Sequence, residues 1–262
     1  MKPKIGFMGQ LTTENVLDDI NFAIENGFDY FEIGLDWEQN FNLKQETIKQ
    51  IKNKSEKNDL SLIVHTPWYL PTCSIIPEIA RAVIKVAKKG IVLATKVNAD
   101  RITIHPGFRE MPTPALHKSY AALIKNLREI VKFGKERGIM VGLENLDKDP
   151  YLMCIEAEEL LKVVNSVDGL KIVLDIGHTN TTSLKPVEYF RKVREFVIDM
   201  HMHDNDGKID QHILIGEGNI DFKALLKECK NLKYNGPFIL ELFPYKNILK
   251  GKERLINIWN RI

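Results

Sequence analysis

The sequence predicts a closed (β/α)₈ barrel of the α/β class that occupies residues 1–262 as a single domain. Two observations lead to this fold class. A short apolar run, a polar turn and a segment with helical period recur about eight times, and no linker or low-complexity tract divides the chain. Barrels of this class have about 250 residues, close to the 262 found here. An open, doubly wound parallel sheet is the alternative, because it shows the same alternation.

Each expected strand is a short run rich in Val, Ile, Leu and Phe, followed by polar or turn-forming residues. Because helical segments separate the runs, the strands are expected to be parallel and joined by right-handed crossovers. In chain order the expected strands are Lys4–Met8, Asp29–Gly34, Leu60–His65, Arg101–His105, Ile139–Glu144, Lys171–Asp175, Ile198–Met202 and Phe238–Glu241.

Apolar residues between the strands recur at the spacing of a helix that buries one face. Val16, Ile20 and Ile24 are four residues apart. Three further segments repeat the pattern: Ile79, Val83, Val86 and Ala87; Leu123, Leu127, Ile130 and Val131; and Leu160, Leu161 and Val164. Helices are therefore expected around these positions.

Turn and capping residues agree with these boundaries. Gly27 and Gly138 directly follow helical patterns, where a left-handed residue commonly ends a helix. Pro186 suits the first turn of a helix, and Asp221 suits the position that caps one. The segment Gly216–Asn219 (GEGN) is a weak signal for a phosphate-binding loop and is more simply explained as a turn.

Composition excludes several classes of protein. The chain has 37 Lys+Arg against 35 Asp+Glu, so a net charge of +2 gives little attraction for nucleic acid. No apolar run reaches the roughly 18 residues of a membrane span, and the N-terminus lacks the apolar core of a signal peptide. The three cysteines are widely spaced and form no C-x-x-C motif, which favours a reducing cytoplasm over disulfides or a thiolate site.

The histidines concentrate where the strands end. Of the seven, only His117 lies in a stretch that precedes a helix. The other six come at or just after the carboxyl end of an expected strand: His65, His105, His178, His201, His203 and His212. In a barrel these ends meet at one rim, where active sites are built. A single buried histidine is usually structural, but six at one rim indicate a common role.

Carboxylates follow the same strand ends. Glu144, Asp175 and Glu241 end three apolar strands, and Asp210 lies in the loop after the seventh strand. In the seventh strand, Asp199, His201 and His203 share one face by the two-residue period. Each acid singly could be a capping or ion-paired residue. Together they would repel one another, and a divalent cation is the natural counter-charge. Histidine with carboxylate and no thiolate favours Zn²⁺, Mn²⁺, Fe²⁺ or Co²⁺ over Ca²⁺.

The segments that carry these residues resemble a known family. The series HTPWYL, ITIHPG, VGLEN, VLDIGH, MHMHD, DQH and ILEL is similar to the xylose isomerase-like TIM-barrel superfamily, which includes sugar and sugar-phosphate isomerases and epimerases as well as endonuclease IV. The resemblance runs from the third strand to the eighth by motif. It implies a TIM barrel with a divalent metal (Zn²⁺, Mn²⁺, Co²⁺ or Mg²⁺) as cofactor.

The isomerase branch of the superfamily implies one metal, held by Glu144, Asp175, His201 and Glu241. His203 would then lie behind the metal ligands or face the substrate. The same resemblance implies that Glu144 and Glu241 act as catalytic base and acid, and that the sugar contacts His65, Trp68, His178 and His203. Glu32 and Trp37 are expected to help shape the pocket.

The endonuclease IV branch implies up to three zinc ions. Its nine ligand positions match His65, His105, Glu144, Asp175, His178, His201, Asp210, His212 and Glu241. Members of that branch insert arginine and aromatic side chains into DNA. Here the loop after the second strand (LDWEQNFNL) has no arginine, and Trp68 and Tyr69 have no basic neighbour in sequence.

The leading hypothesis is therefore a cytoplasmic, metal-dependent isomerase or epimerase of a sugar or sugar phosphate, in which two glutamates move a proton through an enediolate. The first alternative is an endonuclease IV-like zinc phosphodiesterase that would bind DNA at an abasic site, and the second is a metal-dependent sugar-binding barrel without turnover. A Schiff-base aldolase is a weaker rival, because no lysine ends an expected strand at an inward position. No membrane partner is expected, and the sequence leaves a homo-oligomer open.

Overall fold

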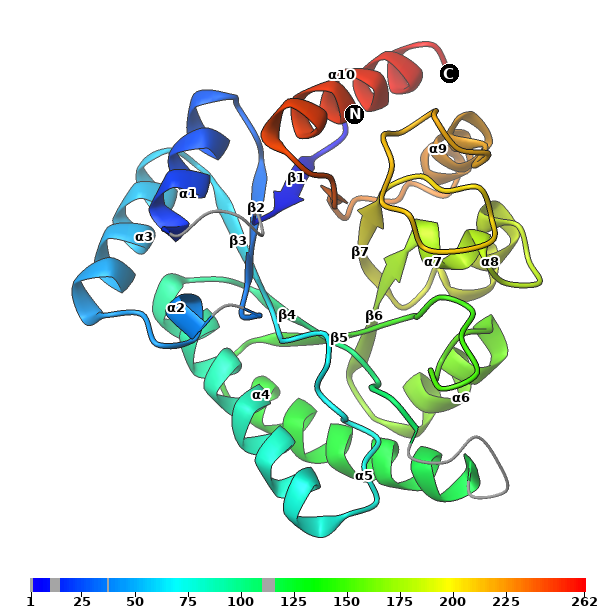
Figure 1. The fold of residues 1–262 in the computed structure, drawn as a ribbon. Helices are drawn as coiled ribbons and strands as arrows, with labels where there is room; N and C mark the ends of the chain where they lie inside the picture. The colour runs from blue at the N-terminus through cyan, green and yellow to red at the C-terminus, as the bar shows by residue number, and fades with distance from the viewer. Residues whose placement is uncertain (1, 10–14, 37, 110–115) are drawn as a thin grey trace.

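Eight parallel strands follow one another around a closed barrel, and helices form a ring outside them (Figure 1). The computed structural model describes residues 2–9, 15–36, 38–109 and 116–262. Strand β8 pairs with β1, which closes the barrel and rules out the open sheet. The strands are β1 (Ile5–Met8), β2 (Tyr30–Gly34), β3 (Ser61–His65), β4 (Arg101–Ile104), β5 (Met140–Glu144), β6 (Leu170–Asp175), β7 (Val197–Met202) and β8 (Phe238–Leu240). The predicted fold class is confirmed.

The outer ring contains the helices that the apolar spacing predicts, together with others that it does not. The helices are α1 (Val16–Glu25), α2 (Glu38–Phe41), α3 (Gln45–Lys57), α4 (Pro77–Val97), α5 (Leu116–Lys135), α6 (Ala157–Ser166), α7 (Ile176–Asn180), α8 (Pro186–Val193), α9 (Phe222–Asn231) and α10 (Tyr245–Asn260). The five-residue helix α7 follows β6 without a loop, so the end of β6 is also the start of a helix.

The expected capping residues have the expected conformations. Asp221 caps α9, where its side chain accepts a hydrogen bond from the backbone N–H of Ala224 at 2.9 Å. Pro186 is the first residue of α8. Gly27 and Gly138 have φ values of +61° and +70°, a region that favours glycine.

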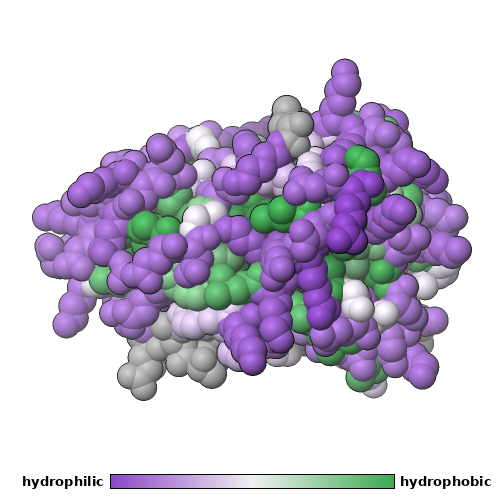
Figure 2. All heavy atoms as spheres, turned by 90° about the horizontal axis from the view of Figure 1, so that it is seen from above, coloured by the Kyte–Doolittle hydropathy of each residue, from purple (hydrophilic) through white to green (hydrophobic). Residues whose placement is uncertain are grey.

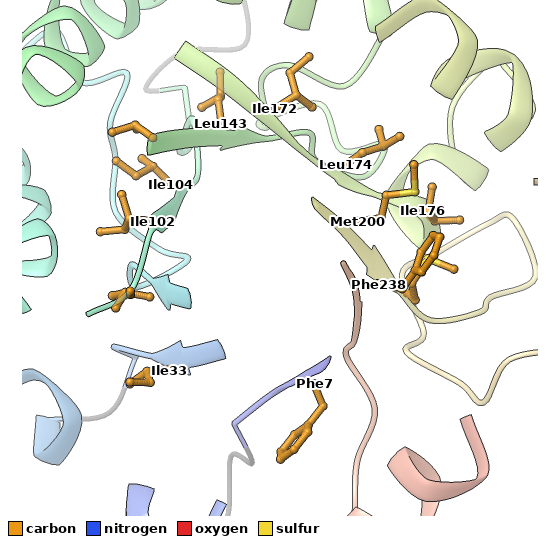
Figure 3. Close-up of a cluster of buried hydrophobic side chains, with 14 of the residues drawn as sticks. Phe7, Ile33, Ile102, Ile104, Leu143, Ile172, Leu174, Ile176, Met200 and Phe238 are labelled. Carbon is orange, nitrogen blue, oxygen red and sulfur yellow. The ribbon is translucent and has the colours of Figure 1, made fainter. Parts of the chain in front are cut away.

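The main apolar core lies between the strands and the helices. In Figure 3, side chains such as Ile104, Leu143 and Ile172 project away from the barrel axis toward the surrounding helices. Burying each such side chain stabilises the fold by about 1.5–3 kcal/mol. Inside the barrel, Tyr30, Ile63 and Ile239 form a second, smaller apolar cluster. Strand β7 shows the division clearly, because Met200 and Met202 join the outer core while His201 faces the interior with its carboxylate neighbours.

The surface is mainly polar. Figure 2 shows one side of the molecule, where hydrophilic residues cover most of the face and hydrophobic atoms show between them. None of the helices that the structure describes combines the length and the apolar character needed to cross a bilayer. The three cysteines Cys73, Cys154 and Cys229 are buried and form no disulfide bond with one another.

Candidate active site

A cavity of about 650 Å³ opens where the strands end, on the rim where barrels of this class build their sites. Eight residues singled out in the sequence line it: His65, Trp68, His105, Glu144, His178, Asp210, His212 and Glu241. Asp175, His201 and His203 are fully buried and contact these lining residues from behind. The fold therefore gathers all eleven predicted site residues into one region, whereas His117 lies apart in α5.

Glu144 ends β5 and is almost completely buried. Its Oε2 atom lies 2.7 Å from Nε2 of His105 and 3.3 Å from Nε2 of His65. Burial alone would raise the pKa of Glu144, but the charges and hydrogen bonds of His105 and His201 outweigh it and hold the pKa well below its usual value. Burial likewise opposes protonation of His65, yet its hydrogen bond to Glu144 and nearby carboxylates raise its pKa to about 9.

His201 lies between three carboxylates. Its Nδ1 atom is 3.0 Å from Oε1 of Glu241 and 3.3 Å from Oε1 of Glu144, while Nε2 is 3.1 Å from Oε2 of Glu32. Glu32 is fully buried, and its other oxygen accepts a hydrogen bond from the Thr103 hydroxyl at 2.7 Å. Burial opposes the charge on His201, but Glu241, Glu144 and Glu32 raise its pKa well above the ordinary value. Glu32 thus lies behind His201 and does not line the cavity.

Asp175 ends β6 and also caps α7. Its Oδ1 atom accepts a hydrogen bond from the backbone N–H of His178 at 2.6 Å. The side chain of Asn145 holds the backbone of Asp175 on both sides, accepting from its N–H at 2.9 Å and donating to its C=O at 3.0 Å. Nε2 of His203 lies 3.1–3.2 Å from the two carboxylate oxygens. Burial would raise the pKa of Asp175, but His178 and His203 lower it.

Gly177 in the DIGH segment leaves room for His203. A Cβ atom at this position would overlap the His203 ring. The glycine lies in helix α7 directly after β6, so its lack of a side chain allows the imidazole to reach Asp175.

The loop after β7 brings a further group to the rim. Nε2 of His212 lies 2.7 Å from Oδ2 of Asp210, and Nε2 of His178 lies 3.4 Å from the same oxygen. The His212 ring stacks on the His203 ring with centroids 3.8 Å apart. Although burial opposes it, the hydrogen bond to Asp210 raises the pKa of His212 to about 9. Burial would raise the pKa of Asp210, but its hydrogen bonds to His178 and His212 lower it strongly.

Four sets of these side chains have ligand atoms close enough to share an ion, all within 4.8 Å of one another: His65, Glu144, His201 and Glu241; Asp175, His203 and Glu241; Glu144, Asp175 and His178; and His178, His203, Asp210 and His212. Both ring nitrogens of His201, Nδ1 of His203 and Oδ1 of Asp210 are buried without a well-aligned hydrogen bond among the described residues. A bound cation would satisfy such atoms, so the residues present fit a divalent metal.

The expected single-metal set does not fall into one of these groups. Glu144 and Glu241 share a group with His201, whereas Asp175 and Glu241 share one with His203. Both imidazoles face the interior because they are two residues apart at the end of β7, His201 within the strand and His203 directly after it. Strand period alone therefore cannot distinguish them, and the choice between them stays a prediction.

The cavity wall also contains residues that the motifs did not reveal. Apolar and aromatic side chains line it, among them Phe108, Leu146, Leu152 and Phe243, and so do the acids Asp36, Asp147 and Asp149. Burial raises the pKa of Asp147. These residues come from irregular loops, where no periodicity marks them in the sequence. Trp37, also expected at the pocket, lies outside the described residues.

Comparison with known proteins gives consistent relatives. A family model described as "Xylose isomerase-like TIM barrel" matches residues 20–258. The uncharacterized protein MJ1311 of Methanocaldococcus jannaschii is 30% identical over 253 residues, covering 92% of this chain and 84% of that protein. Fructoselysine 3-epimerase of Shigella flexneri is 26% identical and covers 84% and 82%. Probable endonuclease 4 of Mesomycoplasma hyopneumoniae is 28% identical and covers 70% of each chain.

A solved structure of a D-tagatose 3-epimerase-like protein superposes with a TM-score of 0.90. It is 27% identical and covers 98% of both chains. The relatives thus include sugar epimerases and an endonuclease, the same two branches that the sequence motifs resemble.

Proposed function

We propose that this chain, which belongs to the xylose isomerase-like TIM-barrel family, is a metal-dependent epimerase or isomerase of a ketose. The observation that carries the proposal is the placement of Glu144 and Glu241, two buried glutamates whose Oε1 atoms lie 3.3 and 3.0 Å from the same imidazole nitrogen of His201. The similarity to a D-tagatose 3-epimerase-like structure and to fructoselysine 3-epimerase supports epimerisation at the carbon beside the ketone.

The ion would be held by Glu144, Asp175 and Glu241 together with one of the two imidazoles at the end of β7. Of the two candidates we favour His203, because its Nε2 atom lies against Asp175 and because it shares a ligand group with both Asp175 and Glu241. This assignment changes the role expected from the sequence for His201, which then supports Glu144 and Glu241 from behind. When bound, a divalent ion supplies Lewis-acid polarisation of the ketone and the neighbouring hydroxyl.

The protein's own residues would carry the proton. One glutamate removes the proton beside the carbonyl, and the other returns a proton on the opposite face, which inverts the carbon through an enediolate. His105 and His201 keep Glu144 ionised and therefore able to act as the base. The substrate would contact His65, Trp68 and His178 at the cavity wall, while the buried surroundings exclude water from the reacting carbon.

Solvent exchange tests this reaction. The metal-loaded protein is incubated in D₂O with ketoses such as D-fructose, D-psicose and D-tagatose, and deuterium and epimer formation are followed by NMR. We expect deuterium at C-3 and the appearance of the C-3 epimer. Deuterium at C-1 with formation of an aldose would indicate an isomerase. No exchange with any ketose in protein of verified metal content would contradict the proposal.

The second candidate is an endonuclease IV-like zinc phosphodiesterase. The observation that favours it is the group of His178, Asp210 and His212, which a single-ion site does not require. This candidate predicts about three zinc ions per chain and nicking of duplex DNA at an abasic site, whereas one ion and no nicking would exclude it. A sugar-binding barrel without turnover would instead show thermal stabilisation by a sugar with no exchange.

A further inference from the structure

The cavity is larger than a simple sugar requires. Its volume of about 650 Å³ equals that of about twenty water molecules in the liquid, far more than a hexose with twelve non-hydrogen atoms displaces. Trp68 and Tyr69 are about half exposed, and their ring centroids are 6.0 Å apart. The Phe108 ring lies 5.7 Å from Trp68. An aromatic wall therefore extends the site outward from the carboxylate–imidazole cluster.

The charge of this outer region is negative. Asp36, Asp147 and Asp149 line the cavity, and among its described lining residues there is no lysine or arginine. Lys148 lies in the same loop as two of these acids but does not line the cavity. Segments 10–14, 37 and 110–115 contain no lysine or arginine in the sequence either. Among the described residues of this wall, therefore, no basic side chain is present that would hold a phosphate against these acids.

Asp36 places one of these acids beside the aromatic wall. Its Oδ1 atom accepts the backbone N–H of Trp68 at 2.9 Å. Its Oδ2 atom is shielded from water and has no hydrogen-bond partner among the described residues. Asp36 and Trp68 line the same cavity, and an acid and the face of an indole ring both attract positive charge, so this part of the wall favours a cation.

In the loop after β7, the backbone N–H groups that could bind an anion already donate to a carboxylate of this chain. The Oδ2 atom of Asp204 accepts hydrogen bonds from the backbone N–H groups of Gly216 and Gly218 at 2.8 and 3.0 Å. Its Oδ1 atom accepts from the N–H groups of Ile220 and Asn205. In barrels a phosphate is often held by backbone groups of the loops after the last strands. Here an internal, fully buried carboxylate takes that place.

We infer that the substrate is an unphosphorylated ketose conjugate, whose sugar end lies at the carboxylate–imidazole cluster and whose appended group is positively charged and rests against Trp68 and Asp36. This inference rests on the proposed function, because a ketose held by its reacting carbons at the cluster must direct its remaining end toward the mouth. A phosphate at that end would lie among like charges.

Binding of matched ketoses tests the inference. Calorimetry on the Mn²⁺-loaded protein compares D-fructose with its 1- and 6-phosphates, with its 1-O- and 6-O-(2-trimethylammonioethyl) ethers, and with the uncharged 3,3-dimethylbutyl ethers of the same shape. At one of the two positions, we expect the cationic ether to bind roughly tenfold or more tightly than the neutral ether, and the phosphate roughly tenfold more weakly than D-fructose. Both differences in affinity, cationic against neutral ether and phosphate against D-fructose, should decrease at high salt.

A variant that lacks one acid of the outer wall tests whether this wall causes the preference for the cationic ether. The variant Asp36→Asn, at the acid that the appended group is inferred to contact, should lose most of the preference for the cationic ether, and its circular dichroism spectrum and metal content should match those of the wild type, which shows that it is folded. Asp206→Asn, in a loop residue that does not line the cavity, is the matched control and should retain the preference.

Two results would overturn the inference: phosphates that bind as tightly as D-fructose at both positions, or cationic ethers that gain nothing over neutral ones at either. These binding results do not depend on turnover. Failure of the proposed function would appear separately, as ligands that bind without C–H exchange. Absence of binding by every ketose would contradict both.

Discussion

Nε2 of His105 lies 2.7 Å from Oε2 of Glu144, in a region where both side chains are buried. Four imidazoles have a ring nitrogen within 3.7 Å of this carboxylate: His65, His105, His178 and His201. In the ion-free protein, protons on His65 and His201, whose pKa values the nearby carboxylates raise, offset part of the negative charge of the cluster. A divalent ion would displace the protons of the imidazoles that bind it, because an imidazole must be deprotonated to be a ligand.

Removing the charge of the proposed base should abolish the chemistry and preserve the fold. Glu144→Gln keeps the shape of the side chain but cannot accept the proton, so C–H exchange should fall at least about 100-fold. Glu241→Gln should behave similarly. NMR exchange rates in D₂O, with metal content measured in the same samples, check this. A variant that keeps its metal and exchanges at the wild-type rate would eliminate the two-glutamate mechanism.

The ion-free protein should become less stable as the pH rises from about 6.5 to 9. His65 and His212 have pKa values of about 9 in the folded protein against about 6.5 when unfolded. Their stabilisation is therefore complete below pH 6.5 and is lost as the pH passes through 9. Melting temperatures of the EDTA-treated protein should fall by several degrees over this range, since 1 kcal/mol is worth roughly 2–4 °C in a chain of this size.

The melting temperature of the metal-loaded protein should fall much less over this pH range, because the bound ion, in place of the protons, offsets the charge of the carboxylates. His65→Gln should reduce the pH dependence of the ion-free protein, whereas His117→Gln, at an exposed position of α5, should leave it unchanged. An ion-free protein whose melting temperature stays constant or rises between pH 6.5 and 9 would contradict this account.

Gly177→Ala should damage the site through a steric effect alone. The added Cβ overlaps the His203 ring, so the imidazole must move away from Asp175. We expect at least a tenfold loss of metal affinity, in line with the loss of a ligand or its support. Gly138→Ala is the control: it has a positive φ but no neighbour near its Cβ, so it should cost about 1 kcal/mol and leave metal binding intact. Unchanged affinity in Gly177→Ala would argue against His203 as a ligand.

Asp204→Ala should strongly destabilise the β7 loop. The buried carboxylate accepts hydrogen bonds from four backbone N–H groups, and leaving them unpaired should lower the free energy of unfolding by about 3 kcal/mol or more. Urea denaturation measures this loss. Asp206→Asn in the same loop should change stability by less than about 0.5 kcal/mol, and an equal effect of both would show that the Asp204 contacts are unimportant.

The fold could be predicted because its signals are periodic. Each strand is an apolar run bounded by turn residues, and the expected ends differ from the observed ones by at most one residue, as for Glu241 just after β8. The helix α7 could not be predicted, because five residues are too few to show a helical period. Its start depends on the Asp175 side chain, which serves as cap and as candidate ligand together.

The site could be predicted as a set of residues but not in its internal arrangement. Strand ends converge in any barrel, so Glu144, Asp175 and Glu241 had to meet. The difference between His201 and His203 arises from depth along the barrel axis, which is fixed by the stagger of neighbouring strands and not by one strand's pattern. The acids of the mouth, such as Asp147, come from loop conformation that leaves no period in the sequence.

The metal content of the purified protein tests the central claim most directly. Elemental analysis after dialysis against Zn²⁺ or Mn²⁺ should give at least one tightly held ion per chain in the wild type. Asp175→Asn and Glu241→Gln should each hold substantially less, and Asp206→Asn should match the wild type. A wild-type chain that retains no ion, with a melting temperature unchanged by Zn²⁺, Mn²⁺, Co²⁺ or Mg²⁺, would contradict the proposal that these carboxylates and imidazoles are gathered around a metal.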